Sequence, residues 1–95
     1  MVEQYSELRL GLLGLGFISQ NLNSTLYKTI VGDKTFIVFL DAGTMNAVYP
    51  DYEYNKNNPY STKDIQIDYT WNKEETNACI LANITQFMND VCSNK

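Results

Sequence analysis

The chain has 95 residues, of which 44% are hydrophobic and 19% charged, a composition typical of a single small globular domain. Seven Lys and Arg against eleven Asp and Glu leave a net charge of −4, which argues against direct binding of nucleic acid by phosphate neutralisation. The sequence contains no histidine, which excludes Ser-His-Asp or Cys-His catalysis within one chain and zinc sites with imidazole ligands.

The first apolar segment alternates leucines with other residues, as in a strand: Leu8, Arg9, Leu10, Gly11 and Leu12. Gly14 and Gly16 follow, which indicates a bend or bulge. We therefore expect a first strand over residues 7–15, with an N-terminal helix as the structural alternative.

Gly14-Leu15-Gly16 follows this apolar run, and Asp41 ends a strand-like segment downstream. In these residues the segment 8–41 resembles the opening of a Rossmann dinucleotide-binding unit. The resemblance implies that residues 17–30 form a helix, that Gly14 and Gly16 let backbone amides approach a pyrophosphate, and that Asp41 bonds the ribose hydroxyls. The alternative is a strand within 17–30, with the glycines only bending the chain.

The middle of the chain predicts a β-meander. Residues 25–31 and 35–40 are β-branched and aromatic, and Gly32-Asp33 between them suits a two-residue hairpin turn. A second turn over 41–44 leads to a short strand at 45–49. Because residues 36–40 are apolar on both faces, we place that strand centrally in the sheet.

Residues 50–63 are polar, contain both prolines, and are predicted to form a long loop. Acidic and aromatic side chains crowd in and beside it, and together they predict a protein-binding surface: Tyr49, Asp51, Tyr52, Glu53, Tyr54 and Tyr60. From Asp41 to Asp68, five acids and two lysines give a net charge of −3. The alternative is a solvated loop whose tyrosines fold back over the sheet.

Alternation over 65–71 predicts a half-buried strand, and a helix is expected over 73–92. Asn72 suits the N-cap, with Glu75 in the capping-box position. An apolar stripe follows at helical spacing: Ile80, Leu81, Ile84, Phe87, Met88 and Val91. This helix also holds Cys79 and Cys92 about 20 Å apart, too far for a disulfide, so we expect reduced thiols in a cytoplasmic protein.

The start of the chain is acidic where a signal peptide needs basic residues, and no apolar run reaches the ~18 residues of a membrane helix. We therefore expect a chain without a leader and without contact with the membrane.

Five carboxylates are candidates for acid–base catalysis: Asp41, Asp51, Glu53, Asp64 and Asp68. Asp64 and Asp68 share a strand face but lie about 13 Å apart along it, too far for an acid–base pair. No acidic pattern typical of a metal site is present. We predict a protein that is not an enzyme and needs no cofactor.

The sequence thus predicts an α+β fold, a twisted antiparallel sheet of four to five strands with the amphipathic C-terminal helix on one face. Apolar side chains left on the other face would be buried by a homodimer: Leu12, Leu15, Phe17, Ile37 and Phe39. The functional prediction is an inhibitor- or immunity-type module that docks on a basic surface of another protein. Two alternatives stay open, a nucleotide-binding protein that uses Gly14, Gly16 and Asp41, and an assembly subunit without a ligand.

Overall fold

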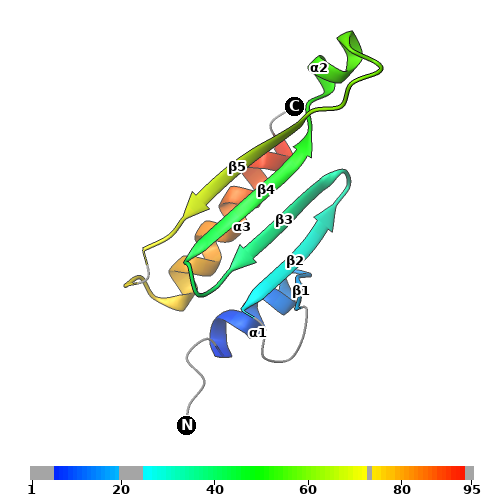
Figure 1. The fold of residues 1–95 in the computed structure, drawn as a ribbon. Coiled ribbons are helices and arrows are strands. Elements are labelled where there is room, and N and C mark those ends of the chain that lie inside the picture. Colours follow the sequence, from blue (N-terminus) through cyan, green and yellow to red (C-terminus); the bar gives the residue numbers. More distant parts are fainter. Residues whose placement is uncertain (1–5, 20–24, 73, 94–95) are drawn as a thin grey trace.

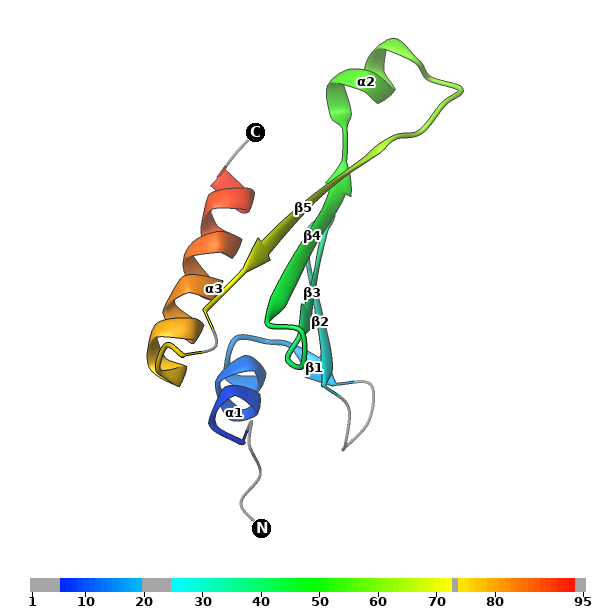
Figure 2. The ribbon, with the colours of Figure 1, turned by 60° about the vertical axis from the view of Figure 1, so that its left-hand side comes forward.

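The computed structural model describes residues 6–19, 25–72 and 74–93. Five antiparallel strands form one sheet in chain order, and two of the three helices lie on one face of it (Figures 1 and 2). The elements are α1 (Ser6–Gly14), β1 (Ile18–Ser19), β2 (Leu26–Val31), β3 (Lys34–Phe39), β4 (Thr44–Pro50), α2 (Tyr52–Asn57), β5 (Asp64–Thr70) and α3 (Asn77–Ser93). The predicted α+β class, the antiparallel sheet and the C-terminal helix are confirmed.

The turn between β2 and β3 is the predicted two-residue hairpin. Val31 pairs with Lys34, and Gly32 between them has a φ of 63°, which its missing Cβ permits. A glycine with positive φ at the first central position is typical of a type II′ turn, whose twist matches the strands. The apolar strand β3 lies third of the five strands, as its two-sided pattern predicted.

The core lies between the sheet and the helices α1 and α3. Phe36 pairs with Ala47 and Val38 pairs with Met45, so these four buried side chains form one patch on the helix-facing side of β3 and β4. From α3, Ile80 completes the same core, together with other buried residues of the two helices: Leu8, Leu12, Ile84 and Val91.

The predicted strand over 7–15 is wrong, because this segment forms α1. Leu8 and Leu12 are buried at the i, i+4 spacing of a helix face, whereas Leu10 between them is 70% exposed. Leucines at 8, 10 and 12 fit the two-residue period of a strand, but Leu8 and Leu12 also have the four-residue spacing of one helix face. The helix was the stated alternative, but it packs beside α3 instead of covering the opposite face (Figure 2).

This placement of α1 changes which side chains remain outside the core. Leu12 and Phe17 are fully buried in the core, contrary to the prediction that they lie on the free face. Leu15 follows the end of α1 and is exposed. Ile37 and Phe39 do lie on the face of the sheet that α1 and α3 leave uncovered, and both are half-buried.

Helix α3 begins later than predicted. The Thr76 hydroxyl accepts the Cys79 N–H at 3.2 Å, so Thr76 is the N-cap. Asn72 instead accepts the Glu74 N–H at 2.9 Å, closing a turn ahead of the helix, and the capping box with Glu75 does not form. The predicted apolar stripe is confirmed, and Cys79 and Cys92 are both free and exposed.

The open question of residues 17–30 is settled in favour of strand for the described part, since β1 and β2 occupy it. Residues 20–24 lie outside the described residues. In the part of the chain that the structure describes, no helix combines the length and the apolar character needed to cross a bilayer.

Candidate functional site

Residues 51–63, which we call the arm, project from the end of the sheet between β4 and β5 (Figures 1 and 2). The arm contributes to an elongated shape, with principal extents of 54 × 25 × 21 Å. It was predicted to be a loop throughout, but it contains the short helix α2. Asp51 caps this helix by accepting the Tyr54 N–H at 3.2 Å, an effect of local sequence that was missed.

Hydrogen bonds within the arm hold it in shape without any contribution from the core. The Asp51 N–H donates to the Lys63 carbonyl at 2.9 Å, and the Lys63 N–H donates to Asn55 Oδ1 at 2.9 Å. The Lys63 ammonium lies 3.9 Å from the Asp51 carboxylate and 5.2 Å from the centre of the Tyr54 ring. The arm is therefore an ordered extension of the β4–β5 hairpin.

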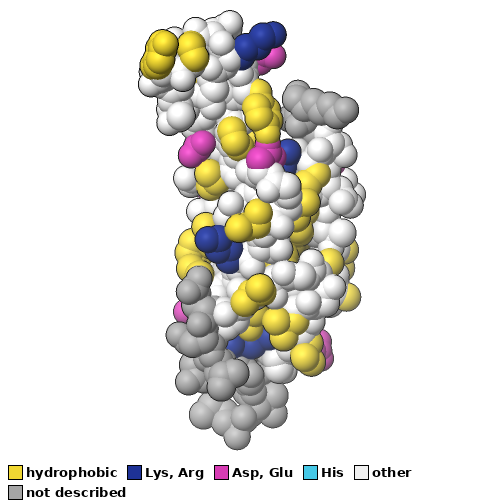
Figure 3. All heavy atoms as spheres, turned by 90° about the vertical axis from the view of Figure 1, so that its right-hand side faces the viewer, with side chains coloured by type: hydrophobic (Ala, Val, Ile, Leu, Met, Phe, Trp, Pro, Cys, Tyr) yellow, Lys and Arg dark blue, Asp and Glu magenta, His cyan; other side chains and the backbone are white. Residues whose placement is uncertain are grey.

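The tyrosines of the arm face solvent, and hydrophobic side chains show on the surface of the arm at the top of Figure 3. Tyr52 is 63% exposed, Tyr60 is fully exposed, and Tyr54 is exposed beside Lys63. These three do not fold back over the sheet, as the alternative interpretation required. Tyr49 behaves differently, since it lies at the end of β4, is half-buried and packs against the core.

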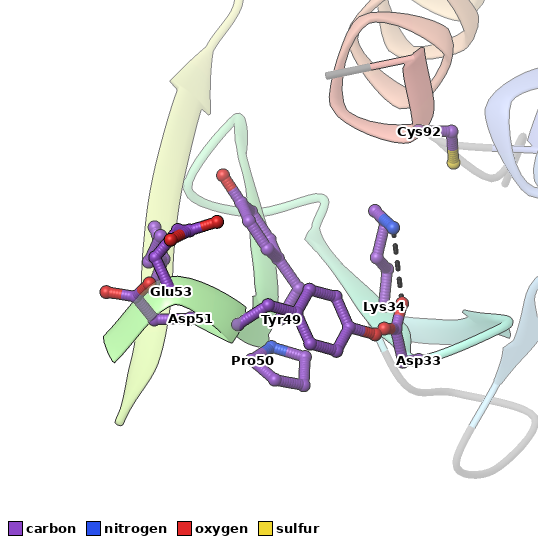
Figure 4. Close-up of a pocket in the computed structure, with 9 residues that line it drawn as sticks. Asp33, Lys34, Tyr49, Pro50, Asp51, Glu53 and Cys92 are labelled. Atoms are coloured by element: carbon purple, nitrogen blue, oxygen red, sulfur yellow. Dashed lines mark hydrogen bonds and ion pairs between the residues drawn. The ribbon is translucent and has the colours of Figure 1, made fainter. Parts of the chain in front are cut away.

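A cleft of about 570 Å³ lies at the base of the arm. It is bounded by the start of the arm, the β2–β3 turn and the last turn of α3 (Figure 4). Nine residues line it: Asp33, Lys34, Tyr49, Pro50, Asp51, Tyr52, Glu53, Ile65 and Cys92. Four of the six predicted binding residues therefore come together here, whereas Tyr54 and Tyr60 do not line the cleft.

Sequence reasoning missed Asp33, Lys34 and Cys92 as members of this site. One signal was present, because alternate turns of an antiparallel meander lie at the same end of the sheet. The turn at 32–33 and the segment at 50–63 therefore had to be neighbours. The position of Cys92 depends on how α3 crosses the sheet, which the sequence pattern does not fix.

The structure disperses the negative charge that the sequence concentrates between Asp41 and Asp68. Asp41 lies at the opposite end of the sheet from the arm, where its carboxylate accepts the Thr25 hydroxyl at 3.1 Å. Asp68 lies on the uncovered face of β5 and accepts the Gln66 amide at 3.2 Å. At the cleft, Asp33 pairs with Lys34 at 3.2 Å, as the dashed line in Figure 4 marks.

Glu53 differs from the other cleft carboxylates, because no ion pair links it to another described residue of the chain. It is exposed on the first turn of α2, next to Tyr52. An unpaired carboxylate beside exposed aromatic rings can accept hydrogen bonds from a cationic group while a ring packs against that group.

The glycines of the predicted nucleotide turn have a structural role at the end of α1. The Phe17 N–H donates to the Leu12 carbonyl at 3.0 Å and the Gly16 N–H to the Leu13 carbonyl at 3.1 Å, which is the Schellman pattern. Gly16 has a φ of 98°, and Gly14 is the last residue of the helix. The helix thus ends at these glycines instead of beginning after them, so the predicted phosphate-binding turn at a helix amino end is not formed.

The structure does not bring the three predicted ligand residues together. Gly16 borders a shallow hollow of about 530 Å³ with Lys28 and Ile30 among its lining, and neither Gly14 nor Asp41 lines it. The geometry of a Rossmann opening is therefore absent from the described residues.

Replacing Gly16 with alanine is expected to lower the free energy of unfolding by about 1–2 kcal/mol, because a Cβ disfavours the positive φ. Gly14→Ala is the matched control. No described heavy atom lies within 4 Å of its Cβ position, so it should be neutral or slightly stabilising. Urea unfolding of both variants measures the difference, and equal effects would contradict the Schellman assignment.

Replacing residues 51–63 by Asn-Gly is expected to leave the domain folded, with a change in unfolding free energy within about 1 kcal/mol. The arm contributes no residue to the buried core, and the β4–β5 ladder ends at the Pro50–Asp64 pair. Thermal unfolding and far-UV circular dichroism test this. Loss of cooperative unfolding would mean that the arm is needed for the fold.

Metal binding gains no geometric basis from the described residues. Asp64 and Asp68 occupy one face of β5, as predicted, with Gln66 between them. Across the ranges that the structure describes, no three Cys, Asp or Glu side chains are grouped so that they could hold a metal ion.

Comparisons with protein-family models, curated proteins and solved structures find no match.

Proposed function

We propose that this chain is a non-enzymatic binding module that docks on another protein through the arm and the cleft at its base, and so inhibits or masks that partner. The observation that carries the proposal is the arm itself. It is ordered by its own hydrogen bonds, adds nothing to the core and presents Tyr52 and Tyr60 to solvent.

Exposed tyrosines on an ordered segment favour protein contact. A tyrosine offers a large apolar ring and a hydroxyl at a small cost in side-chain entropy, which is why it is enriched at binding hot spots. The hydrogen bonds of Asp51 and Asn55 fix the backbone in advance, so less conformational entropy is lost when a partner binds.

The charges of the cleft indicate which partner group it would take. Asp33 and Asp51 each have a lysine of the same chain as a partner, whereas Glu53 has none among the described residues. Lys34 lies 5.9 Å from the Tyr49 ring centre, so this end of the molecule already holds an ammonium beside an aromatic ring. A lysine or arginine on a basic partner surface would repeat this arrangement at Glu53 and Tyr52.

A photo-crosslinking amino acid placed at position 60 or 52 tests the proposal in cells that express the chain. We expect one discrete protein adduct from both positions, identified by mass spectrometry and then confirmed with the purified partner. Leu10 is the matched control position, because it is 70% exposed but lies on α1 at the other end of the molecule.

Binding of the purified partner should be lost in Tyr52→Ala and in Glu53→Lys, while the melting temperature of both variants stays close to that of the parent. Glu75→Lys is the charge control for Glu53→Lys, since Glu75 is exposed ahead of α3, outside both the arm and the cleft. Adducts that form equally from position 10 would overturn the proposal. A saturable rise in melting temperature with a nucleotide would instead support the small-ligand alternative.

A further inference from the structure

We infer that the outer edge of β5 is an interface for a second copy of this chain, which adds its own β5 in antiparallel orientation with Ile67 opposite Ile67. The inference does not rest on the proposed function of the arm. It comes from the edge of the sheet, from the pattern of side chains along β5 and from the register in which that pattern is self-complementary.

β5 is a long and regular edge strand. All seven of its residues pair with β4, and β4 is its sole neighbour within the described part of the sheet (Figure 1). An edge strand leaves a row of backbone N–H and C=O groups free to bond another strand. β5 contains no proline, glycine or lysine, the residues that commonly block such pairing.

The other edge of the sheet is different. In the described part of the chain, β1 covers two residues, which pair with Lys28 and Tyr27 of β2. A strand this short offers few backbone groups to a partner strand, and shortness is one way in which edges are protected. The longest strand edge without a paired neighbour in the described sheet is therefore β5.

Centring the pairing on Ile67 makes the two strands complementary. On the uncovered face, Gln66 of each copy lies opposite Asp68 of the other, and Asp64 lies opposite Thr70. The Gln66 amide already donates to Asp68 within the strand at 3.2 Å, so the same donor and acceptor can bond between copies. On the helix side, Ile65 lies opposite Tyr69, and all three residues of that face are half-buried and apolar.

Neighbouring registers are disfavoured by charge. Centring on residue 66 places Asp64 opposite Asp68 twice, and centring on residue 68 places the two Asp68 carboxylates opposite each other. Like charges directly opposite destabilise a sheet pair. A shift by one residue would set helix-side groups against uncovered-side groups. The register centred on Ile67 also pairs the full length of the strand from Asp64 to Thr70.

Sedimentation equilibrium over a range of concentrations measures the self-association directly, and we expect a monomer–dimer equilibrium. Gln66→Glu should raise the dissociation constant of the dimer by roughly tenfold, because each Asp68 would then face a carboxylate of the other copy. Gln66→Lys should lower it several-fold, because each Asp68 would face an ammonium. Asn57→Asp and Asn57→Lys are the matched controls, since they make changes of one charge on the arm, away from the edge. They should leave the dissociation constant unchanged.

Cysteine crosslinking tests the register in a background where Cys79 and Cys92 are replaced by serine. The pair Gln66→Cys and Asp68→Cys should form a disulfide-linked dimer under mild oxidation, because the two positions face each other across the interface. Asn57→Cys, equally exposed, should not. Circular dichroism shows whether each variant is folded.

A folded chain that remains monomeric at millimolar concentration would overturn the inference. So would a dimer whose dissociation constant responds equally to Gln66 and Asn57 substitutions, since that dimer would use another surface. Loss of partner crosslinking at position 60 with the dimer intact would count against the proposed function alone, so the two proposals fail separately.

Discussion

Replacing Phe36 with alanine is expected to lower the free energy of unfolding by about 3–5 kcal/mol. Phe36 has no exposed surface and lies in the central strand, between Thr29 of β2 and Ala47 of β4. Truncation removes the buried ring and leaves a cavity that a paired strand cannot close. A domain of this size has a total stability of about 5–15 kcal/mol, so the loss would be a large fraction of it.

Urea unfolding followed by the fluorescence of Trp71, the sole tryptophan, measures this loss. Phe39→Ala is the matched control, because Phe39 lies on the same strand, points to the uncovered face and is only half-buried. We expect its cost to be well under half that of Phe36→Ala. Equal losses would show that the two faces of the sheet are buried equally well.

Gly11→Val is expected to destabilise the fold by about 1–3 kcal/mol through overpacking between α1 and α3. A Cβ at Gly11 would overlap Leu81 Cδ1 and lie 2.7 Å from Leu81 Cδ2, so the Leu81 side chain would have to move. The glycine therefore lets the first helix rest directly on the last one, although an interior glycine weakens a helix by about 1 kcal/mol.

A double-mutant cycle with Leu81→Ala isolates this contact. Each single substitution should be destabilising, and the double variant should recover much of the loss caused by Gly11→Val, because the shortened side chain makes room for valine. Chemical unfolding of the four proteins gives the coupling. Strictly additive losses would mean that α1 and α3 do not meet at this point.

In the inferred dimer, the two proposed docking arms would lie far apart. β5 joins the arm at one end and carries the inferred interface along its length, so an antiparallel dimer would project its two arms in opposite directions. Such a dimer could engage two sites on a repetitive partner and gain avidity without new contacts. Variants at Gln66 should then change the apparent affinity for a multivalent partner but not for an isolated site.

Much of the fold was predictable from local pattern. Residues 26–50 form the expected meander, because β-branched and aromatic runs are separated by glycine-containing turns, and Gly32-Asp33 has the backbone freedom that a tight hairpin needs. The apolar stripe of α3 was likewise readable at helical spacing. The six residues predicted to bind a partner were chosen from composition, and four of them line one cleft.

The errors arose where one pattern fits two structures. The leucines at 8, 10 and 12 fit either a strand or a helix. In the helix that forms, Gly11 has no side chain and so leaves room for Leu81 of α3. Asn72 and Thr76 are both good N-cap residues, so the sequence could not choose between them. Gly14 and Gly16 fit a phosphate turn as well as a helix end, and only the path of the chain distinguishes the two.

The sequence by itself determined the fold class, the central position of β3 and the absence of histidine chemistry, because these depend on residue type and short-range periodicity. Tertiary structure alone decided that α1 and α3 share one face, that Asp41 lies far from the arm, that Cys92 meets Asp33 and Lys34 at the cleft, and that β5 ends the sheet. The physical reason is that each of these facts joins residues distant in the chain, whose contact depends on how whole elements pack.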